Sequence, residues 1–310
     1  MSNLSISNLA SQLGSEKINI LNLGKKYPNW NIKSVIKKTG IKKVYIANKD
    51  EDVLNLSIKS CRKTLKNFKK EKIDCVIVVT QTAKKKLPSV SCMLQDKLKL
   101  RKNIIALDIG LGCSGFVYGL SIINSLLNSK TAKTVLFVCS DTYSKFLNNE
   151  NRTCRTVFSD AASTCIVQKN NLKKSLKFSF LTDGSGANDL IENDNNIEMK
   201  GANIFHFTTK NIPYIFNDIL KKNKLHKKDI DQFIFHQASK LVIDELTNVL
   251  QLNKNKVFKN YDNIGNTVSS SIPIALEKLT KNNRIKKNQK IMILGFGVGL
   301  SAAGCILNWK

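Results

Sequence analysis

A cysteine between glycines is the first candidate for covalent chemistry. Cys113 lies in Gly112-Cys113-Ser114-Gly115, after the apolar run at Ile104–Leu107 and directly before apolar residues that recur with helical spacing from Phe116. At such a strand-to-helix turn the free N–H groups and the dipole of the helix favour an anion, and the thiolate is the reactive form of cysteine. Cysteine is also a common buried filler, so this local context leaves a nucleophile and a structural residue as alternatives.

Two further polar side chains stand where segments of predicted structure meet. His236 follows the apolar run Phe233–Phe235 and precedes a predicted helix over Leu241–Leu250, and strand ends of this kind are where sites in open α/β sheets collect. Asn266 lies in a polar turn before a helix expected to start near Pro273. Taken singly, a histidine is more often a structural residue and a turn asparagine is more often a cap.

A glycine-rich stretch, Gly295-Phe296-Gly297-Val298-Gly299, follows the apolar run Ile291–Leu294. A glycine loop after a strand can cradle a nucleotide phosphate, but the third glycine and the helix of that motif are not found here. Close approach of the backbone to a ligand or to a reactive sulfur is the better interpretation.

The elements that must position these residues alternate between strands and helices. Short apolar runs predict buried strands at Cys75–Val79, Ile104–Leu107, Val135–Cys139, Ser163–Val167, Phe233–Phe235 and Ile291–Leu294, and helical spacing covers Phe116–Asn128 and Leu241–Leu250. This pattern indicates an α/β fold with a largely parallel sheet covered on both faces. The polar segment 168–177 suggests a junction between residues 1–168, which hold Cys113, and residues 169–310, which hold His236 and Asn266. Each half carries one unusual strand-to-helix turn, which suggests a duplicated architecture.

Composition narrows the class of protein. The 310 residues include 42% hydrophobic and 24% charged residues, which indicates a folded chain. Eight scattered cysteines with no CxxC pair, and only three histidines, argue against a metal site and against a disulfide framework. No apolar stretch approaches the roughly 18 residues that span a bilayer, and the N-terminus does not resemble a signal peptide. A cytoplasmic protein with reduced thiols is therefore expected.

The net charge of +27, from 50 basic and 23 acidic residues, leaves three interpretations open. It fits a nucleic-acid-binding surface, a compositional bias on solvated faces, or an acidic protein partner whose encounter it accelerates. The lysines are spread over the whole length and do not interleave with aromatic residues, so nucleic acid is the least favoured of the three.

Taken together, these motifs resemble the β-ketoacyl-acyl-carrier-protein synthase III family of thiolase-fold condensing enzymes. The resemblance extends from about residue 24 to residue 304. It is carried by Gly112-Cys113-Ser114-Gly115-Phe116, His236-Gln237-Ala238, Gly265-Asn266-Thr267 with Ser271-Ile272-Pro273, and Gly295 to Gly299, and is supported by Lys38-Thr39-Gly40-Ile41, Leu87-Pro88-Ser89, Asn151-Arg152-Thr153 and Val157-Phe158-Ser159-Asp160.

The resemblance implies a five-layered αβαβα duplication, a homodimer and a buried catalytic triad at the end of a tunnel. Cys113 would take an acyl group from coenzyme A or a carrier protein, and His236 and Asn266 would stabilise the enolate formed as malonyl-carrier protein loses CO2. The backbone N–H groups of Cys113 and Gly299 would form a second oxyanion hole. The substrates would bring the coenzyme A or phosphopantetheine groups, and no cofactor or metal is expected.

Departures from the family pattern concern the substrate contacts. Ser34 stands where the family has a tryptophan that stacks on adenine, while Arg152 and Lys38 keep cations for coenzyme A. Leu87 replaces a phenylalanine that reaches across the dimer into the acyl pocket, to which Phe158 also belongs. The arginine that binds the carrier protein falls at Leu241, so Lys240 is its expected replacement.

The expected function is decarboxylative condensation of an acyl-thioester primer with malonyl-carrier protein. One alternative is acyl transfer from Cys113 to an alcohol or amine, with His236 as general base. Another is a nucleic-acid-binding protein with an inactive condensing fold, which rests on the charge alone. The sequence does not define the length of the acyl primer, the donor thioester or the pathway.

Overall fold

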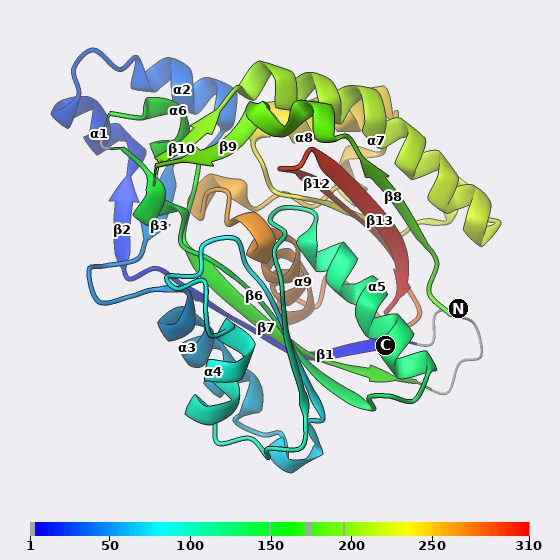
Figure 1. Cartoon of the computed structure of the whole chain (residues 1–310). Helices are drawn as coiled ribbons and strands as arrows, with labels where there is room; N and C mark the ends of the chain where they lie inside the picture. The colour runs from blue at the N-terminus through cyan, green and yellow to red at the C-terminus, as the bar shows by residue number, and fades with distance from the viewer. Residues whose placement is uncertain (1–3, 149, 171–174, 195, 310) are drawn as a thin grey trace.

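The computed structural model describes residues 4–148, 150–170, 175–194 and 196–309, and these fold around two sheets that enclose a pair of helices (Figure 1). The first sheet has the order β1-β7-β6-β4-β5 and the second has the order β11-β12-β13-β8. The first comprises β1 (Leu4–Leu13), β4 (Cys75–Val79), β5 (Ile105–Ile109), β6 (Thr134–Asp141) and β7 (Ala161–Lys169). The second comprises β8 (Phe178–Thr182), β11 (Gln232–Phe235), β12 (Lys290–Gly297) and β13 (Ser301–Asn308).

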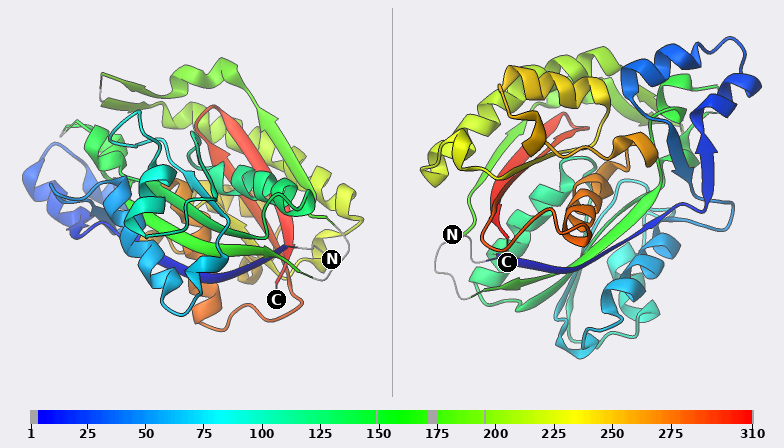
Figure 2. Two further views of the ribbon diagram at one scale, coloured as in Figure 1. Left: turned by 60° about the horizontal axis from the view of Figure 1, so that its bottom comes forward. Right: turned by 180° about the vertical axis from the view of Figure 1, so that it is seen from behind.

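Helices fill the space between the sheets and cover their outer faces, which gives five layers (Figures 1 and 2). Helices α5 (Gly115–Asn128) and α9 (Ser271–Lys281) form the central layer. The first sheet is covered outside by α3 (Val53–Leu65) and α4 (Val90–Lys97), and the second by α7 (Gly201–Asn223) and α8 (Lys240–Val249). The αβαβα architecture expected from the resemblance is therefore confirmed.

The core explains why the strands are apolar on both faces. All five residues of β4 are buried, and so are all eight residues of β6. A continuous apolar cluster joins the two halves through the central helices, with Phe116 of α5 stacked on Phe137 of β6 at 5.2 Å between ring centroids. Because both sheets and both central helices share this core, the halves on either side of the proposed junction are packed as one unit.

The predicted strands lie within β4, β5, β6, β7, β11 and β12, except that β5 begins at Ile105, one residue after the predicted start. The expected largely parallel sheet is wrong. Three neighbouring pairs are parallel, namely β4–β5, β4–β6 and β11–β12, whereas β1–β7, β6–β7, β12–β13 and β13–β8 are antiparallel. Three of the four antiparallel pairs involve β1, β8 or β13, whose small and polar residues hid them from the apolar pattern. The fourth joins the predicted strands β6 and β7. The expected junction at 168–177 falls partly outside the described residues, at 171–174.

The strand orders support the duplication that the two unusual turns suggested. In the first half, β4, β6, β7 and β1 follow one another across the sheet, as β11, β12, β13 and β8 do in the second. Strand β5 has its counterpart in an isolated parallel bridge between Phe233 and Val257. The chain then leads from β5 through Cys113 into α5, and from Val257 through Asn266 into α9. Both functional turns thus enter the central helix layer.

A group of short elements lies beside one end of both sheets, where the site is found (Figure 1). It consists of β2 (Glu16–Asn19), β3 (Lys43–Ile46), α1 (Ile20–Lys26), α2 (Ile32–Thr39), α6 (Arg152–Arg155), β9 (Leu190–Asn193) and β10 (Asn196–Met199). Apolar residues of α1 and α2 pack in one cluster with residues of α7 and α8, so residues 20–39 are bound to the second half. None of the helices in the described ranges is long and apolar enough to cross a membrane.

Candidate active site

Cys113 lies in the turn between β5 and α5 and is 4% exposed. The turn is tight: the N–H of Gly115 donates to the carbonyl of Gly112 at 2.8 Å, and Ser114 is joined to Ser301 of β13 by a 2.8 Å hydrogen bond between hydroxyls. The bond to Ser301 connects the turn to the second sheet. The sulfur is therefore fixed by both halves of the molecule.

The glycine-rich end of β12 presses against this turn. A Cβ atom at Gly295 would lie 2.8 Å from the carbonyl oxygen of Cys113, and one at Gly297 would lie 2.8 Å from its Cβ and 3.0 Å from its Sγ. These distances are too short for a side chain. The interpretation of the glycine stretch as a close approach to a reactive sulfur is borne out, and no helix follows it as a nucleotide-binding loop would require.

The protonation of the thiol differs from the expectation of a favoured thiolate. Burial raises the pKa of Cys113 to about 12, and the charge of the nearby Asp141 acts in the same direction. The backbone N–H groups of Cys113 and Val298 hydrogen-bond to the sulfur and lower the pKa, but burial outweighs them. The free enzyme therefore holds a thiol.

His236 follows β11, and its own N–H donates to the carbonyl of Leu294 in β12 at 2.8 Å. The ring stands edge-on to Phe296, with centroids 5.5 Å apart and planes at 85°, and its Nδ1 lies 2.6 Å from Oγ of Ser271. Burial lowers the pKa of His236 to about 3, so the imidazole is neutral at physiological pH. It can donate a hydrogen bond without carrying a charge.

Asn266 is fixed through its backbone and its side chain. Its N–H donates to the carbonyl of Val157, and its carbonyl accepts from the N–H of Ser159, both at 2.8 Å. Its Oδ1 accepts a 2.9 Å hydrogen bond from the N–H of Val268. Because the oxygen of the carboxamide is occupied, the nitrogen is the end left to interact with a ligand.

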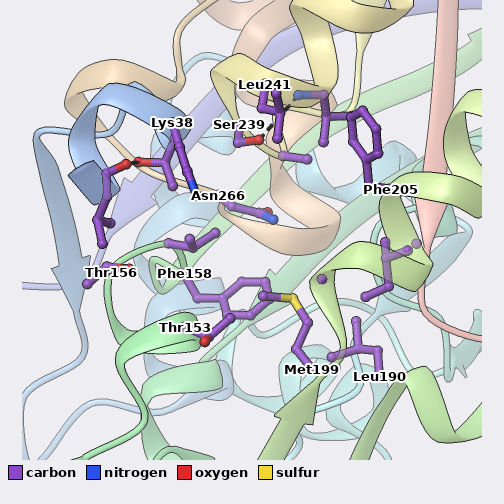
Figure 3. Close-up of a pocket in the computed structure, with 18 of the residues that line it drawn as sticks. Lys38, Thr153, Thr156, Phe158, Leu190, Met199, Phe205, Ser239, Leu241 and Asn266 are labelled. Carbon is purple, nitrogen blue, oxygen red and sulfur yellow. Dashed lines mark hydrogen bonds between the residues drawn. The ribbon is translucent and has the colours of Figure 1, made fainter. Parts of the chain in front are cut away.

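A single cavity of about 480 Å³ brings Cys113, His236 and Asn266 together, although they are far apart in the sequence. Apolar residues line much of it, among them Phe158, Leu190, Met199 and Phe205 (Figure 3). Lys38 of α2 and Arg152 of α6 are exposed and lie along its outer part, and none of the described lining residues is acidic. The cavity therefore suits a long substrate with an apolar thioester end and an anionic end.

The other predicted site residues divide into two groups. Lys38, Arg152 and Phe158 line the cavity. Leu87 does not line it and is 79% exposed on the surface. Lys240 lies beside the lining residues Ser239 and Leu241, but its Nζ pairs with Asp244 at 2.7 Å, and Asp244 also pairs with Lys259. The positive charge of Lys240 is therefore partly neutralised by Asp244, and the sequence did not indicate this ion pair.

The two predicted donors of the oxyanion hole differ in their contacts with the Cys113 sulfur. The hydrogen bonds to the Cys113 sulfur come from the N–H groups of Cys113 itself and of Val298. No such bond is found for Gly299 in the described residues, and its backbone, at φ 137°, approaches Ser301. The N–H of Val298 is thus a further candidate donor beside the predicted Gly299, because the path of the turn after β12 brings it close to the sulfur.

Sequence reasoning missed three residues that hold His236. Ser271 contacts its ring, Phe296 packs against it, and the side chain of Gln237 fixes the following loop through bonds to Phe235, Phe258 and Asn260. Ser271 belongs to a motif that was recognised, but nothing in the spacing connects it with a histidine 35 positions away. Among the described residues there is no cluster of three or more side chains that would hold a metal ion.

A cysteine, a neutral imidazole and a carboxamide in one tunnel, between the halves of an αβαβα duplication, define a thiolase-fold condensing enzyme. Family models agree with this class. Residues 107–184 match the model for 3-oxoacyl-[acyl-carrier-protein] synthase III, and residues 220–309 match the model for its C-terminal part.

Individual relatives cover nearly the whole chain. β-Ketoacyl-[acyl-carrier-protein] synthase III 2 of Bacillus anthracis is 31% identical over 89% of this chain and 89% of its own length. A crystal structure of a 3-oxoacyl-(acyl-carrier-protein) synthase III superposes with a TM-score of 0.96 at 32% identity, covering 99% of this chain and 100% of the other. The enzyme of Aquifex aeolicus superposes with a TM-score of 0.93 at 29% identity over 99% and 100%. The chain belongs to the 3-oxoacyl-[acyl-carrier-protein] synthase III family.

Proposed function

We propose that this enzyme joins an acyl primer to malonyl-carrier protein through an acyl-Cys113 intermediate. The observation that carries this proposal is the convergence of Cys113, His236 and Asn266 in one cavity. In the first half-reaction the Cys113 sulfur attacks the primer thioester, and the bond between the acyl carbon and the donor sulfur breaks. The proton of the Cys113 thiol passes to the departing thiolate, so coenzyme A or the carrier leaves as a free thiol. The backbone N–H groups of Cys113 and Gly299 would stabilise the tetrahedral oxyanion, and the N–H of Val298, which lies close to the Cys113 sulfur, is a further candidate donor.

In the second half-reaction the carbon–carbon bond to the malonyl carboxylate breaks and CO2 leaves. The electron pair passes to the thioester as an enolate, whose oxygen accepts hydrogen bonds from His236 and Asn266. The enolate carbon then attacks the acyl carbonyl, and the bond to the Cys113 sulfur breaks. The departing Cys113 thiolate takes up a proton from water, so the products are a β-ketoacyl-carrier protein, CO2 and the regenerated thiol.

We propose Lys38 and Arg152 as contacts for the phosphates of coenzyme A or phosphopantetheine, and Phe158 as part of the acyl site. Their places in the cavity support these roles. Lys240 remains a proposed contact for an acidic carrier protein, now shared with Asp244 and Lys259.

A homodimer is the proposed assembly. Among the residues that the structure describes, strand β5 pairs with β4 alone, and all five of its residues are partly exposed although Ile105, Leu107 and Ile109 are apolar. An open apolar edge of this kind is suited to pairing with a second copy. The 79% exposure of Leu87 fits the proposal that it contacts the partner. A reducing cytoplasm is the proposed location, since all eight cysteines are free.

Intact-protein mass measurement after incubation with a panel of acyl-coenzyme A and acyl-carrier donors tests the nucleophile. Wild type should gain one acyl group, and Cys113→Ala should gain none. His236→Ala should acylate but release no CO2 from malonyl-carrier protein. If no donor gives an adduct on wild type, the nucleophile assignment is wrong. An adduct without CO2 release would instead favour acyl transfer to an alcohol or amine.

A further inference from the structure

Ser271 is the side chain that hydrogen-bonds to the ring of His236 at Nδ1. It is the first residue of α9 and 1% exposed, and its Oγ lies 2.6 Å from Nδ1 of His236. The same oxygen accepts the backbone N–H of Gln237 at 3.4 Å. The segment after β11 that holds His236 and the first turn of α9 therefore meet at this hydroxyl.

The positions of hydrogens around Ser271 follow from counting donors and acceptors. If Nδ1 carried the ring proton, the Ser271 oxygen would accept from two N–H groups, and its own hydrogen would need another acceptor. The described residues provide no other acceptor for it, and a buried hydroxyl without an acceptor is costly. If the Ser271 hydroxyl donates to Nδ1, both groups are satisfied. The proton of the neutral ring then lies on Nε2.

We propose that Ser271 is a positioning residue that fixes His236 as the tautomer protonated at Nε2. The inference rests on the proposed condensation, for which it has a direct consequence. An Nε2–H group donates to the enolate oxygen, whereas an unprotonated Nε2 would accept a proton and act as a base. Ser271 thereby favours condensation over general-base acyl transfer at the same triad.

The second donor is fixed by the same turn. Val268 has a φ of 50°, in the left-handed region that β-branched residues avoid, and its N–H donates to Oδ1 of Asn266. This bond turns the carboxamide nitrogen toward the ligand side. Residues 268–271 therefore present both catalytic groups as N–H donors. Val268 orients the amide of Asn266, and Ser271 fixes the tautomer of the His236 ring.

Nuclear magnetic resonance can read the tautomer without any turnover. The chain has only three histidines, so the protein with ¹⁵N-labelled histidine gives a simple long-range ¹H–¹⁵N spectrum, and His206→Gln and His226→Gln identify the other two. Wild type should show His236 in the Nε2–H form. Ser271→Ala should give exchange between the two neutral forms. A wild-type spectrum of the Nδ1–H form would overturn the proposal.

Kinetics separate positioning from a structural role. Ser271→Ala should lower condensation about tenfold, the value of one lost hydrogen bond to a catalytic group, and leave acylation of Cys113 within about twofold. Ser271→Thr retains the hydroxyl and should recover most of the loss.

Ser270→Ala is the matched control. Its Oγ is equally buried at the same turn but donates to the carbonyl of Cys139, not to His236. Equal losses in Ser270→Ala and Ser271→Ala, or a loss of acylation together with condensation, would overturn the positioning role. Should Ser271→Ala not fold, the wild-type spectrum and Ser271→Thr still decide. If wild type fails to acylate with every donor, the proposed function itself is wrong, which is a separate result.

Discussion

At the scale of single residues, the reactivity of Cys113 depends on the absence of a side chain opposite it. Gly297→Ala would place a Cβ 3.0 Å from the Cys113 sulfur and 2.8 Å from its Cβ, so the thiol must move. Because a displacement of about 1 Å can cost a factor of 10² in rate, acylation should fall by about that factor. Time-resolved intact mass with an acyl-coenzyme A donor measures the acylation rate.

Gly110→Ala is the control for this substitution. It lies three residues before Cys113, and a Cβ atom there would meet nothing within 4 Å. Its acylation rate should remain within about twofold of wild type, by the usual small effect of a tolerated surface change. Comparable losses in the two variants would contradict the role assigned to the close approach.

At the scale of elements, α2 and α6 carry the cations at the mouth of the cavity. We expect Lys38→Ala and Arg152→Ala each to raise KM for acyl-coenzyme A about 3- to 10-fold with little change in kcat, because each loses one charge contact remote from the reacting atoms. The effect should shrink at high salt, which screens exposed charges. Steady-state kinetics at two salt concentrations measure both.

Lys37→Ala supplies the comparison, since Lys37 is an exposed neighbour of Lys38 that does not line the cavity. An equal rise of KM in this variant would show that the overall charge of +27, not the two positions, governs binding. Running acyl-carrier donors beside coenzyme A would show which donor uses these cations.

Ser34 lines the same stretch of α2 without an aromatic ring, so adenine has no stacking partner from that position.

At the scale of the whole molecule, the open edge of β5 predicts self-association. Sedimentation equilibrium at micromolar concentration should give twice the chain mass of 34.7 kDa. Leu107→Asp places a charge in the middle of the edge strand and should shift the protein toward the monomer. Its acylation should weaken as well if the partner helps to close the acyl site.

Val249→Asp tests whether a charge placed on any exposed apolar residue shifts the protein toward the monomer. Val249 is 45% exposed on α8, an outer helix over the second sheet. This variant should retain the wild-type mass. A monomeric wild type, or equal dissociation of both variants, would argue against β5 as the interface.

Local patterns in the sequence determined a large part of the protein. The apolar runs located β4, β6, β7, β11 and β12, and helical spacing located α5 and α8, because burial on both faces or on one stripe is visible over a few residues. The same holds for the motifs around Cys113, His236 and Asn266, from which the resemblance to the family was drawn. These features can be predicted because they depend on residues that lie close together in the sequence.

Only the tertiary structure decided the features that depend on contacts between distant residues. The antiparallel strands β1, β8 and β13 pair through backbone groups that leave little trace in side-chain composition. The raised pKa of Cys113 arises from burial by both halves, the pairing of Lys240 from Asp244, and the contact of the Val298 N–H with the sulfur from the turn after β12. The hydroxyl of Ser271 reaches His236 across 35 positions. The sequence thus predicted which groups perform the chemistry, whereas packing decided which hydrogen bonds hold them.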